Sequence, residues 1–261
     1  MTVAEASRNE LWVCHLGVVP YRTAIAVQEL ISASRRAEEL PDTLLLLEHP
    51  PLYTRGRRSG AEDLPFPEAF YRAKGIDVLA TDRGGRLTYH GPGQLVGYPI
   101  MRIADVDRFL RTIEDAIVVA LAGAGVAARS RHDEGIDYTG VWVQERKIAS
   151  IGLHVSRGIS THGFAVNVEN DLEPFSWVIA CGLPDVSMTS LARESSDGCA
   201  RAPERSLACF RRRVAHSFCG AHGRRQRLVS PRRLGIDGLL AQAAARTSPA
   251  SADLQREPLP A

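Results

Sequence analysis

The sequence predicts an α+β protein built on a mixed or largely antiparallel β-sheet with flanking helices. The chain has 261 residues, 44% of them hydrophobic, which is enough to bury one sizeable core. Segments typical of strands follow one another across short glycine turns and do not alternate strictly with helices, as they would in a doubly wound fold. Two longer segments, 21–40 and 105–122, carry apolar residues at helical spacing.

The first hundred residues are expected to form, in order, a strand at 11–19, a helix at 21–40, a strand at 43–49, a short helix at 66–74 and strands at 75–82, 85–90 and 94–103. The apolar spacing that predicts the first helix is made by Ile25, Leu30, Ile31 (or Ala33) and Ala37. The run TLLLLEH is short and almost wholly apolar, which is typical of a buried strand, and two prolines end it. Glycine turns separate the last three strands.

The rest of the chain is expected to hold a helix at 105–122, strands at 125–130, 139–144, 147–156 and 162–170, and short helices at 171–179 and 204–218. The apolar stripe of the helix at 105–122 consists of Phe109, Leu110, Ile113, Ile117 and Leu121, and glycines end it. Beyond about residue 225 the sequence is rich in Arg, Ala, Ser and Pro. We therefore expect one domain over 1–225 and a flexible, loosely attached tail over 226–261.

Composition excludes several classes of protein. A net charge of +2 argues against a polyanion binder, although the arginine-rich segment 201–233 is consistent with a solvated surface or with attraction of an acidic protein partner. No apolar run approaches the ~20 residues that cross a bilayer, and the first residues show no signal peptide. The five cysteines include no C-x-x-C pair, so we expect neither disulfides nor a zinc site. We expect a soluble cytoplasmic protein that binds neither nucleic acid nor membrane.

The stretch 83–94, RGGRLTYHGPGQ, has the most distinctive local composition. A Walker loop needs Lys-Ser or Lys-Thr after its glycines, and a dinucleotide fingerprint needs a helix, so neither phosphate site fits. A metal role for His90 lacks a second ligand at close spacing. The polar side chains of the stretch are Arg83, Thr88, Tyr89, His90 and Gln94. Polar groups around backbone that glycine leaves uncovered favour a ligand-binding wall over a plain pair of turns, with Thr88 and His90 on one face.

Lys147 and Cys181 are the candidates for chemistry. Strand parity puts Lys147 on the same apolar face as Ala149 and Ile151, where its amine would be partly desolvated. The alternative is a lysine at the sheet edge whose ammonium reaches water. Cys181 precedes Gly182 at a turn, where a cysteine can react, although cysteines are also common as inert fillers. A nearby ammonium would favour the thiolate, and a neutral lysine could accept a proton from an incoming nucleophile.

Other polar residues have weaker claims. Cys14 is expected in the core, and His49 is expected to be a structural histidine at a strand end. His162 and Asn167, in THGFAVNV, are equally consistent with a pocket wall and with a satisfied buried polar role.

Four segments together resemble the lipoyl(octanoyl) transferase family, the octanoyl-[acyl-carrier-protein]:protein N-octanoyltransferases. The matching stretches, in the order and spacing of the family and within roughly 10–220, are LLLLEHPPLYTRGR, TDRGGRLTYHGPGQLVGYPI, GVWVQERKIASIGLHVSRGISTHGFAVNV and VIACGLPDVSMTSL. RGG-x-x-T-Y-H-G-P-G-Q combined with K-I-A-S-I-G, H-G-F-A-x-N-V and C-G-L is highly specific. The resemblance implies an α+β domain like the catalytic domain of biotin and lipoate protein ligases.

The resemblance also implies an activity: transfer of an octanoyl group from octanoyl-acyl carrier protein, through a cysteine thioester, to a lysine of a lipoyl domain. This is the first step of endogenous protein lipoylation and needs no cofactor or metal. The expected acceptors are the lipoyl domains of 2-oxoacid dehydrogenase E2 subunits and the glycine cleavage H protein.

Within this resemblance, Cys181 matches the acyl-thioester nucleophile and Lys147 matches the lysine that pairs with it. The positions that match substrate-binding segments are Arg83, Gly84, Gly85, Arg86, Leu87, Thr88, Tyr89, His90, Ser150, Ile151, Gly152, Gly163, Phe164 and Ala165. The chain departs from the family at Ala180, where a proline is usual, and beyond about residue 225, which has no clear counterpart.

The sequence is compatible with two alternative functions. One is an ATP-dependent lipoate or octanoate ligase on the same fold, which would need no nucleophilic cysteine. The other is a non-catalytic module that binds acylated carrier proteins. The pairing of Cys181 with Lys147 favours the transferase over both.

Overall fold

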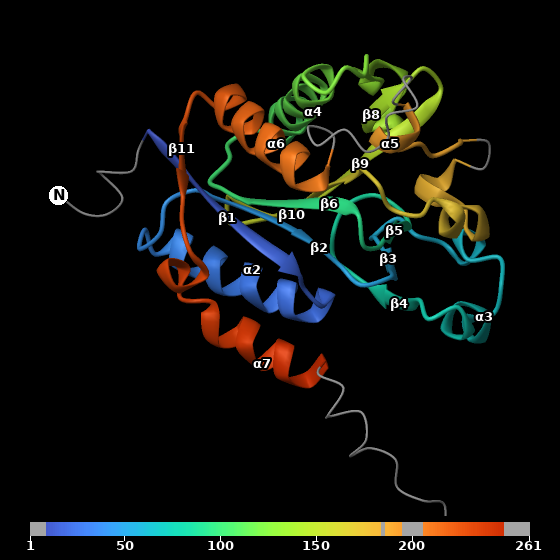
Figure 1. Cartoon of the computed structure of the whole chain (residues 1–261), viewed down its shortest axis with the longest axis horizontal. Coiled ribbons are helices and arrows are strands. Elements are labelled where there is room, and N and C mark those ends of the chain that lie inside the picture. The colour runs from blue at the N-terminus through green and yellow to red at the C-terminus, as the bar shows by residue number, and fades with distance from the viewer. Residues whose placement is uncertain (1–8, 184–185, 195–205, 248–261) are drawn as a thin grey trace, which may run out of the picture.

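The computed structural model describes residues 9–183, 186–194 and 206–247 and shows two sheets joined side by side (Figure 1). The main sheet has the strand order β11-β1-β2-β6-β10-β9-β8-β7, and the second has the order β4-β3-β5. The main-sheet strands are β1 (Glu10–Val18), β2 (Thr43–Glu48), β6 (Gln94–Ile100), β7 (Arg129–Ser130), β8 (Gly140–Val143), β9 (Arg146–Ser156), β10 (Ile159–Asn167) and β11 (Arg225–Leu228). Within the described part of this sheet, only the β11–β1 and β1–β2 pairs are parallel. The predicted mixed, largely antiparallel sheet is therefore confirmed.

Helices cover both faces of the main sheet, which lies between two layers in Figure 1. The helices on one face are α4 (Val106–Ala122) and α6 (Leu207–Ala221), which pack on apolar side chains such as Leu95, Phe164 and Val166. The opposite face is covered by α2 (Tyr21–Arg36) and α7 (Asp237–Thr247), over a core that includes Trp12, Leu45 and Val96. Alternate residues of one strand thus enter different cores, as the two-residue period of a strand requires.

The second sheet is smaller and more aromatic. Its strands are β3 (Leu52–Arg55), β4 (Asp77–Ala80) and β5 (Thr88–His90), and the adjoining elements are η1 (Ala61–Asp63), α3 (Glu68–Ala73), η4 (Glu173–Trp177) and η5 (Ala180–Gly182). Tyr53, Tyr71 and Tyr89 form its core together with Phe175. The remaining short elements are η2 (His132–Glu134), η3 (Ile136–Tyr138), α5 (Leu191–Glu194) and η7 (Pro231–Leu234).

Helix α4 is predicted accurately, whereas α2 buries a partly different stripe from the expected one. Asp105 caps α4 by accepting a hydrogen bond from the Arg108 amide, and Gly123 ends it. In α2 the predicted Leu30, Ala33 and Ala37 are exposed or lie beyond the helix. The buried positions of α2 are Tyr21, Ala24, Val27, Gln28, Ile31 and Ser32. Ile31 is buried as expected and Ile25 is half-buried, but small and polar residues make up much of the buried stripe, so hydrophobicity alone identified only part of it.

The C-terminal segment 225–247 is packed onto the domain, so the expectation of a loosely attached tail is wrong for these residues. Strand β11 pairs with β1, and Leu234 and Ile236 are buried beneath α2. The guanidinium of Arg233 lies 5.2 Å from the centre of a Trp12 ring. A few apolar side chains that pack against α2 are sufficient to order a segment whose composition suggested disorder. Residues 248–261 lie outside the described part of the chain.

Candidate functional site

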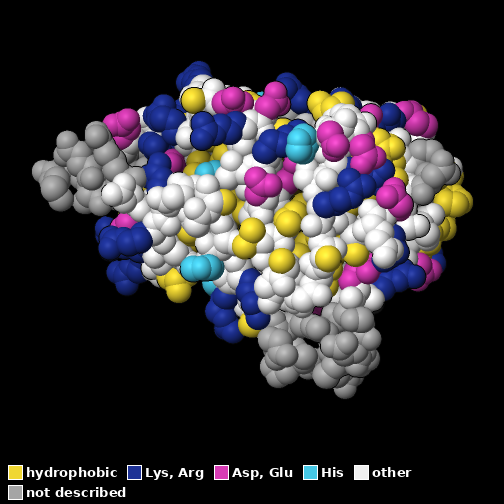
Figure 2. Space-filling model, turned by 90° about the horizontal axis from the view of Figure 1, so that it is seen from above, with side chains coloured by type: hydrophobic (Ala, Val, Ile, Leu, Met, Phe, Trp, Pro, Cys, Tyr) yellow, Lys and Arg dark blue, Asp and Glu magenta, His cyan; other side chains and the backbone are white. Residues whose placement is uncertain are grey.

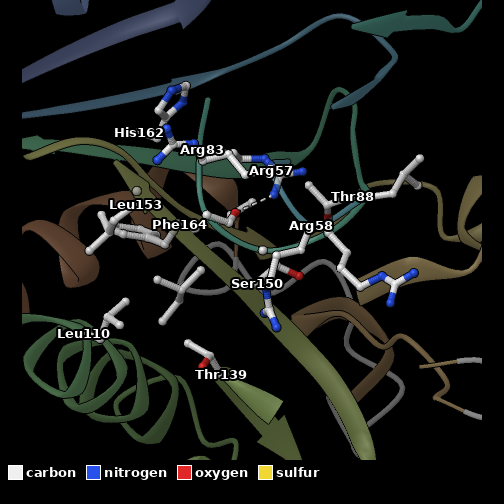
Figure 3. Close-up of a pocket in the computed structure, with 18 of the residues that line it drawn as sticks. Arg57, Arg58, Arg83, Thr88, Leu110, Thr139, Ser150, Leu153, His162 and Phe164 are labelled. Carbon is white, nitrogen blue, oxygen red and sulfur yellow. Dashed lines mark hydrogen bonds between the residues drawn. The ribbon is translucent and has the colours of Figure 1, made fainter. Parts of the chain in front are cut away.

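A cavity of about 380 Å³ opens where the two sheets meet, within the ~300–1,000 Å³ range of small-molecule sites (Figure 3). Its walls come from β6, β9 and β10, from the segments 57–58, 83–88 and 136–139, and from the first turns of α2 and α4. Val96, Leu110, Leu153 and Phe164 make much of the lining apolar. The arrangement suits a ligand with an extended apolar part.

All but one of the residues assigned to substrate binding line this cavity. They are Arg83, Gly84, Gly85, Arg86, Leu87, Thr88, His90, Ser150, Ile151, Gly152, Gly163, Phe164 and Ala165. Tyr89 does not line it, because alternation along β5 turns its ring toward Tyr53 and Phe175 in the core of the second sheet. The sequence pattern thus brings residues from three distant segments around one space.

The glycine-rich segment 83–86 lies alongside β9 and is hydrogen-bonded to it and to the segment 57–58. The Gly84 amide donates to the Leu153 carbonyl at 2.8 Å, and the Arg58 amide donates to the Gly85 carbonyl at 3.1 Å. A Cβ on Gly152 would lie only 2.7 Å from the Gly84 carbonyl oxygen. Glycine at position 152 is therefore required for the close approach of the two backbones.

Arg83 braces this segment to β3. Its Nη2 donates to the Thr54 carbonyl at 2.6 Å, and its Nε donates to the Thr54 hydroxyl at 3.1 Å. The side chain is buried, and Nη1 also donates to the Gly84 carbonyl at 3.0 Å. In Figure 3 this arginine lies along the upper wall of the cavity, near His162. Much of its hydrogen-bonding capacity is committed to holding the wall.

Histidine and tyrosine side chains form a polar part of the cavity wall. His162 Nε2 lies 2.7 Å from Asp82 Oδ1, which assigns the proton to Nε2, and Nδ1 faces the Tyr21 hydroxyl at 3.4 Å. Burial lowers the pKa of His162 even though Asp82 opposes the shift. His90 Nδ1 donates to Gln94 Oε1 at 2.8 Å and Nε2 lies 3.3 Å from the Thr54 hydroxyl, and burial holds the pKa of His90 well below the usual range. These histidines are neutral near pH 7.

Lys147 is 2% exposed and lines the cavity, so the edge position with an ammonium in water is wrong. The parity prediction is also wrong, because β9 contains a bulge opposite β8. Val141 pairs with Ala149 but Trp142 pairs with Lys147, which leaves Ile148 as an extra residue. The bulge shifts Lys147 from the face of Ala149 to the face of Ser150.

The backbone of Cys181 belongs to η5, and its side chain lies outside the described part of the structure. Gly182 packs against the Arg86 side chain, which also lines the cavity. The Ile179 amide donates to the Asp63 carbonyl, and Asp63 forms an ion pair with Arg86 at 3.0 Å. Farther along, the Lys147 amide donates to the Ser187 carbonyl at 2.9 Å. The segment that carries Cys181 is thus attached both to the cavity wall and to the strand of Lys147.

His49 and Asn167 have structural roles. His49 is fully buried, with Nδ1 donating to the Val19 carbonyl and Nε2 accepting from the Tyr98 hydroxyl, both at 2.6 Å. Asn167 accepts from Gln94 and donates to the Thr189 carbonyl, so it joins β6, β10 and the segment after η5. Burial raises the pKa of the Cys14 thiol to about 11, consistent with its predicted place in the core.

Several lining residues were not identified from the sequence. They include Tyr21, Arg57, Arg58, Val96, Tyr98, Val106, Asp107, Leu110, Ile136, Asp137, Thr139 and Leu153. The wall reaches the surface at Val106 and Ile136, and Figure 2 shows apolar side chains mixed with charged ones on the α4 side of the molecule. Arg58 and Asp137 form an ion pair of 2.8 Å between two of these segments. Val96, Leu110 and Leu153 lie in segments whose apolar residues predicted a strand or a helix, but those patterns do not indicate a cavity.

The described residues hold neither a candidate metal centre nor a candidate membrane span. No three His, Cys, Asp or Glu side chains among them are grouped to hold a metal ion. None of the helices in the described ranges is long and apolar enough to span a membrane.

Comparison with known proteins agrees with the predicted fold and family. The family model of the lipoyl protein ligase A/B catalytic domain matches residues 20–218. An octanoyltransferase of Rubrobacter xylanophilus is 48% identical over 182 residues, covering 68% of this chain and 80% of that protein. An octanoyltransferase of Caldicellulosiruptor bescii is 43% identical over 185 residues, covering 69% and 80%. A bipartite lipoate protein ligase of Thermoplasma acidophilum superimposes with a TM-score of 0.65 at 16% identity, covering 96% and 99%.

The fold is therefore that of the lipoate protein ligase catalytic domain, as predicted. Within this class the chain belongs to the lipoyl(octanoyl) transferase family, and it is an acyltransferase.

Proposed function

We propose that this enzyme transfers an octanoyl group from octanoyl-acyl carrier protein to a lysine of a lipoyl domain, with Cys181 as the covalent carrier. The observation that carries the proposal is a buried lysine on the wall of a largely apolar cavity, with the Cys181 segment attached to the strand of that lysine. The names of the relatives support the octanoyl group as the cargo. The donor, the thioester and the acceptors follow from the family resemblance.

In the first step, the Cys181 thiolate attacks the carbonyl carbon of the donor thioester. The bond from that carbon to the carrier's sulfur breaks, and the leaving thiolate takes a proton from the Lys147 ammonium. This exchange of one thioester for another is close to balanced in energy, so activation of the thiol decides its rate. Lys147 is left as a neutral amine beside the acyl-enzyme.

In the second step, the lysine amine of the lipoyl domain attacks the acyl-Cys181 carbonyl. The bond to the Cys181 sulfur breaks, an amide forms, and Lys147 takes the proton that the attacking amine loses. Both groups return to their starting states. Because a thioester is replaced by an amide, this step is downhill. The acceptors proposed for it are the lipoyl domains of 2-oxoacid dehydrogenase E2 subunits and the glycine cleavage H protein.

The cavity accounts for binding of the acyl chain and for imperfect selection of its length. Leu87, Val96 and Ala165 offer apolar contacts along the cavity wall. Each buried methylene contributes about 0.8 kcal/mol. A hydrophobic pocket discriminates one methylene by only about 1–3 kcal/mol. Acyl chains slightly shorter or longer than octanoyl are therefore expected to react at reduced rates.

Intact-protein mass spectrometry after incubation with octanoyl-acyl carrier protein tests the proposal. We expect an octanoyl adduct in the wild type and none in Cys181→Ala. No adduct in the wild type, or an adduct that persists in Cys181→Ala, would remove this cysteine from the mechanism. Octanoylation of a lipoyl domain that required ATP and free octanoate would instead identify a ligase.

A further inference from the structure

Glu114 is a fully buried carboxylate that the mechanism above does not use. It lies in the middle of α4, 0% exposed, between the apolar core residues Ile113 and Ile117. A buried charge is costly unless its hydrogen-bonding groups are satisfied. Its partners therefore indicate what it is for.

Three segments donate to this carboxylate. The Gly140 amide donates to Oε1 at 2.8 Å. Ser130 Oγ donates to Oε2 at 2.9 Å, and Arg111 Nη1 donates to the same oxygen at 2.7 Å. His132 Nδ1 lies 3.9 Å from Oε2. Glu114 thus fastens the start of β8 to α4, with Oε1 facing the backbone of Gly140.

The Lys147 side chain packs against the backbone of Gly140. A Cβ on Gly140 would lie 2.7 Å from Lys147 Cε and 3.4 Å from Nζ. Gly140 has a φ of +140°, a conformation that other residues rarely adopt. The position of this one backbone unit therefore limits where the lysine amine can lie.

The indole of Trp142 is the second surface beside the Lys147 side chain. Lys147 Nζ lies 5.2 Å from the centre of a Trp142 ring, within cation–π range. Trp142 Nε1 donates to the Tyr138 carbonyl at 2.9 Å, so the indole is fixed to the segment that leads into Gly140. Movement of residues 138–140 would shift both surfaces that contact the lysine.

We propose that Glu114 is a positioning residue for Lys147, acting through its hydrogen bond to the Gly140 amide. The proposal rests on the proposed function, because it takes Lys147 as the group that moves the proton. Glu114 does not itself line the cavity, so its effect passes through the backbone beside the lysine. Loss of the acceptor at Gly140 frees that wall, and the amine leaves its reactive position.

The test compares Glu114→Ala with Glu114→Gln. Glutamine keeps an oxygen that accepts from the Gly140 amide, so we expect it to retain most of the transfer rate, whereas alanine leaves that amide without an acceptor. A displacement of about 1 Å in a reacting group costs on the order of 10²-fold in rate. We expect a loss of that size for Glu114→Ala in octanoyl transfer from pre-formed acyl-enzyme to a lipoyl domain, with an unchanged KM for the acceptor.

Asp42→Ala is the matched control for loss of a buried carboxylate. Asp42 is 5% exposed, accepts from Arg35 at 2.7 Å and from the Arg102 amide at 2.9 Å, and does not line the cavity. It should lower thermal stability without the selective loss of transfer. If Glu114→Ala and Asp42→Ala, compared at temperatures where both are folded, lose equal activity, the positioning role is overturned. The same holds if Glu114→Gln is as slow as Glu114→Ala.

A spectroscopic readout makes the inference independent of the octanoyl reaction. Lys74 and Lys147 are the two lysines of the chain, so ¹³C-labelled lysine yields two sets of side-chain NMR signals. The ring current of Trp142 should displace the Lys147 methylene signals, and Glu114→Ala should return them toward the values of an ordinary lysine while Glu114→Gln preserves them. Unmoved signals in Glu114→Ala would refute the inference even if transfer were confirmed. Signals that move as expected would support it even if the substrate proved different.

Discussion

The two groups proposed to do the chemistry stand on very different supports. Lys147 lies in β9, which is paired with β8 and β10, and its side chain is buried. Cys181 lies in η5, a three-residue turn that is held mainly through its neighbours Ile179 and Gly182. Proton transfer needs a fixed amine, whereas a cysteine that exchanges acyl groups between two large proteins must meet each of them. Lys147 is therefore the more firmly supported of the two residues proposed to do the chemistry.

Replacing Lys147 by methionine gives the largest expected effect on this comparison. Methionine is neutral and of similar length, and exchanging a buried charge for an apolar group does not by itself unfold a protein. General acid–base catalysis typically contributes about 10²–10⁴-fold, so we expect transfer to the lipoyl domain to fall about 10³-fold. The rate is measured by mass spectrometry of the acceptor, with the exposed Lys74→Met as control. Near-normal transfer by Lys147→Met would remove the lysine from the mechanism.

Replacing Arg86 by alanine tests the cysteine side. Arg86 forms ion pairs with Asp63 and Glu62, and its aliphatic part packs against Gly182. We expect octanoyl-Cys181 formation to slow by about 10-fold, because the turn loses its brace and the thiol is positioned less often. Arg86→Met, which keeps the packing without the ion pairs, should fall in between. Equal rates in Arg86→Ala and wild type would show that η5 is positioned without this arginine. The exposed pair Arg72–Glu68 offers a control, since Arg72→Ala should leave the rate unchanged.

The sequence predicted helix α4, most of the cavity wall and the strands other than β3 and β11, because these depend on local period and on a dense run of glycines and polar groups. Strand β3 follows two prolines and β11 lies in an arginine-rich segment, so neither showed the pattern of a strand. The sequence also did not predict the bulge at Ile148, since one extra residue in a strand leaves no trace in the hydrophobic pattern. Glu114 was overlooked because a glutamate in a helix usually faces water, and its partners Ser130 and Gly140 come from distant segments. The order of residues 225–247 depends on tertiary contacts of Leu234 and Ile236, which composition does not encode.

A smaller effect concerns the buried histidines of the firmly packed part of the molecule. Burial lowers the pKa of His49 to about 4, whereas an unfolded histidine titrates near ~6.5. Between these values the unfolded chain binds a proton that the folded protein does not, so acid favours unfolding. The contribution is complete above about pH 6.5 and is lost as the pH falls toward about 4.

We therefore expect the free energy of unfolding to fall between pH 7 and pH 5. His49 contributes at most about 1.4 kcal/mol per pH unit to this fall. His49→Gln should be less stable at pH 7, because it disturbs the contacts with Val19 and Tyr98, yet its stability should depend less on pH. His90 and His222, whose pKa values are also lowered by burial, account for the slope that remains. Melting temperatures measured across this range decide the matter. An unchanged slope in His49→Gln would mean that His49 has the same pKa in the folded and the unfolded protein, so that at pH 5 it would place a positive charge directly behind the wall of the acyl cavity.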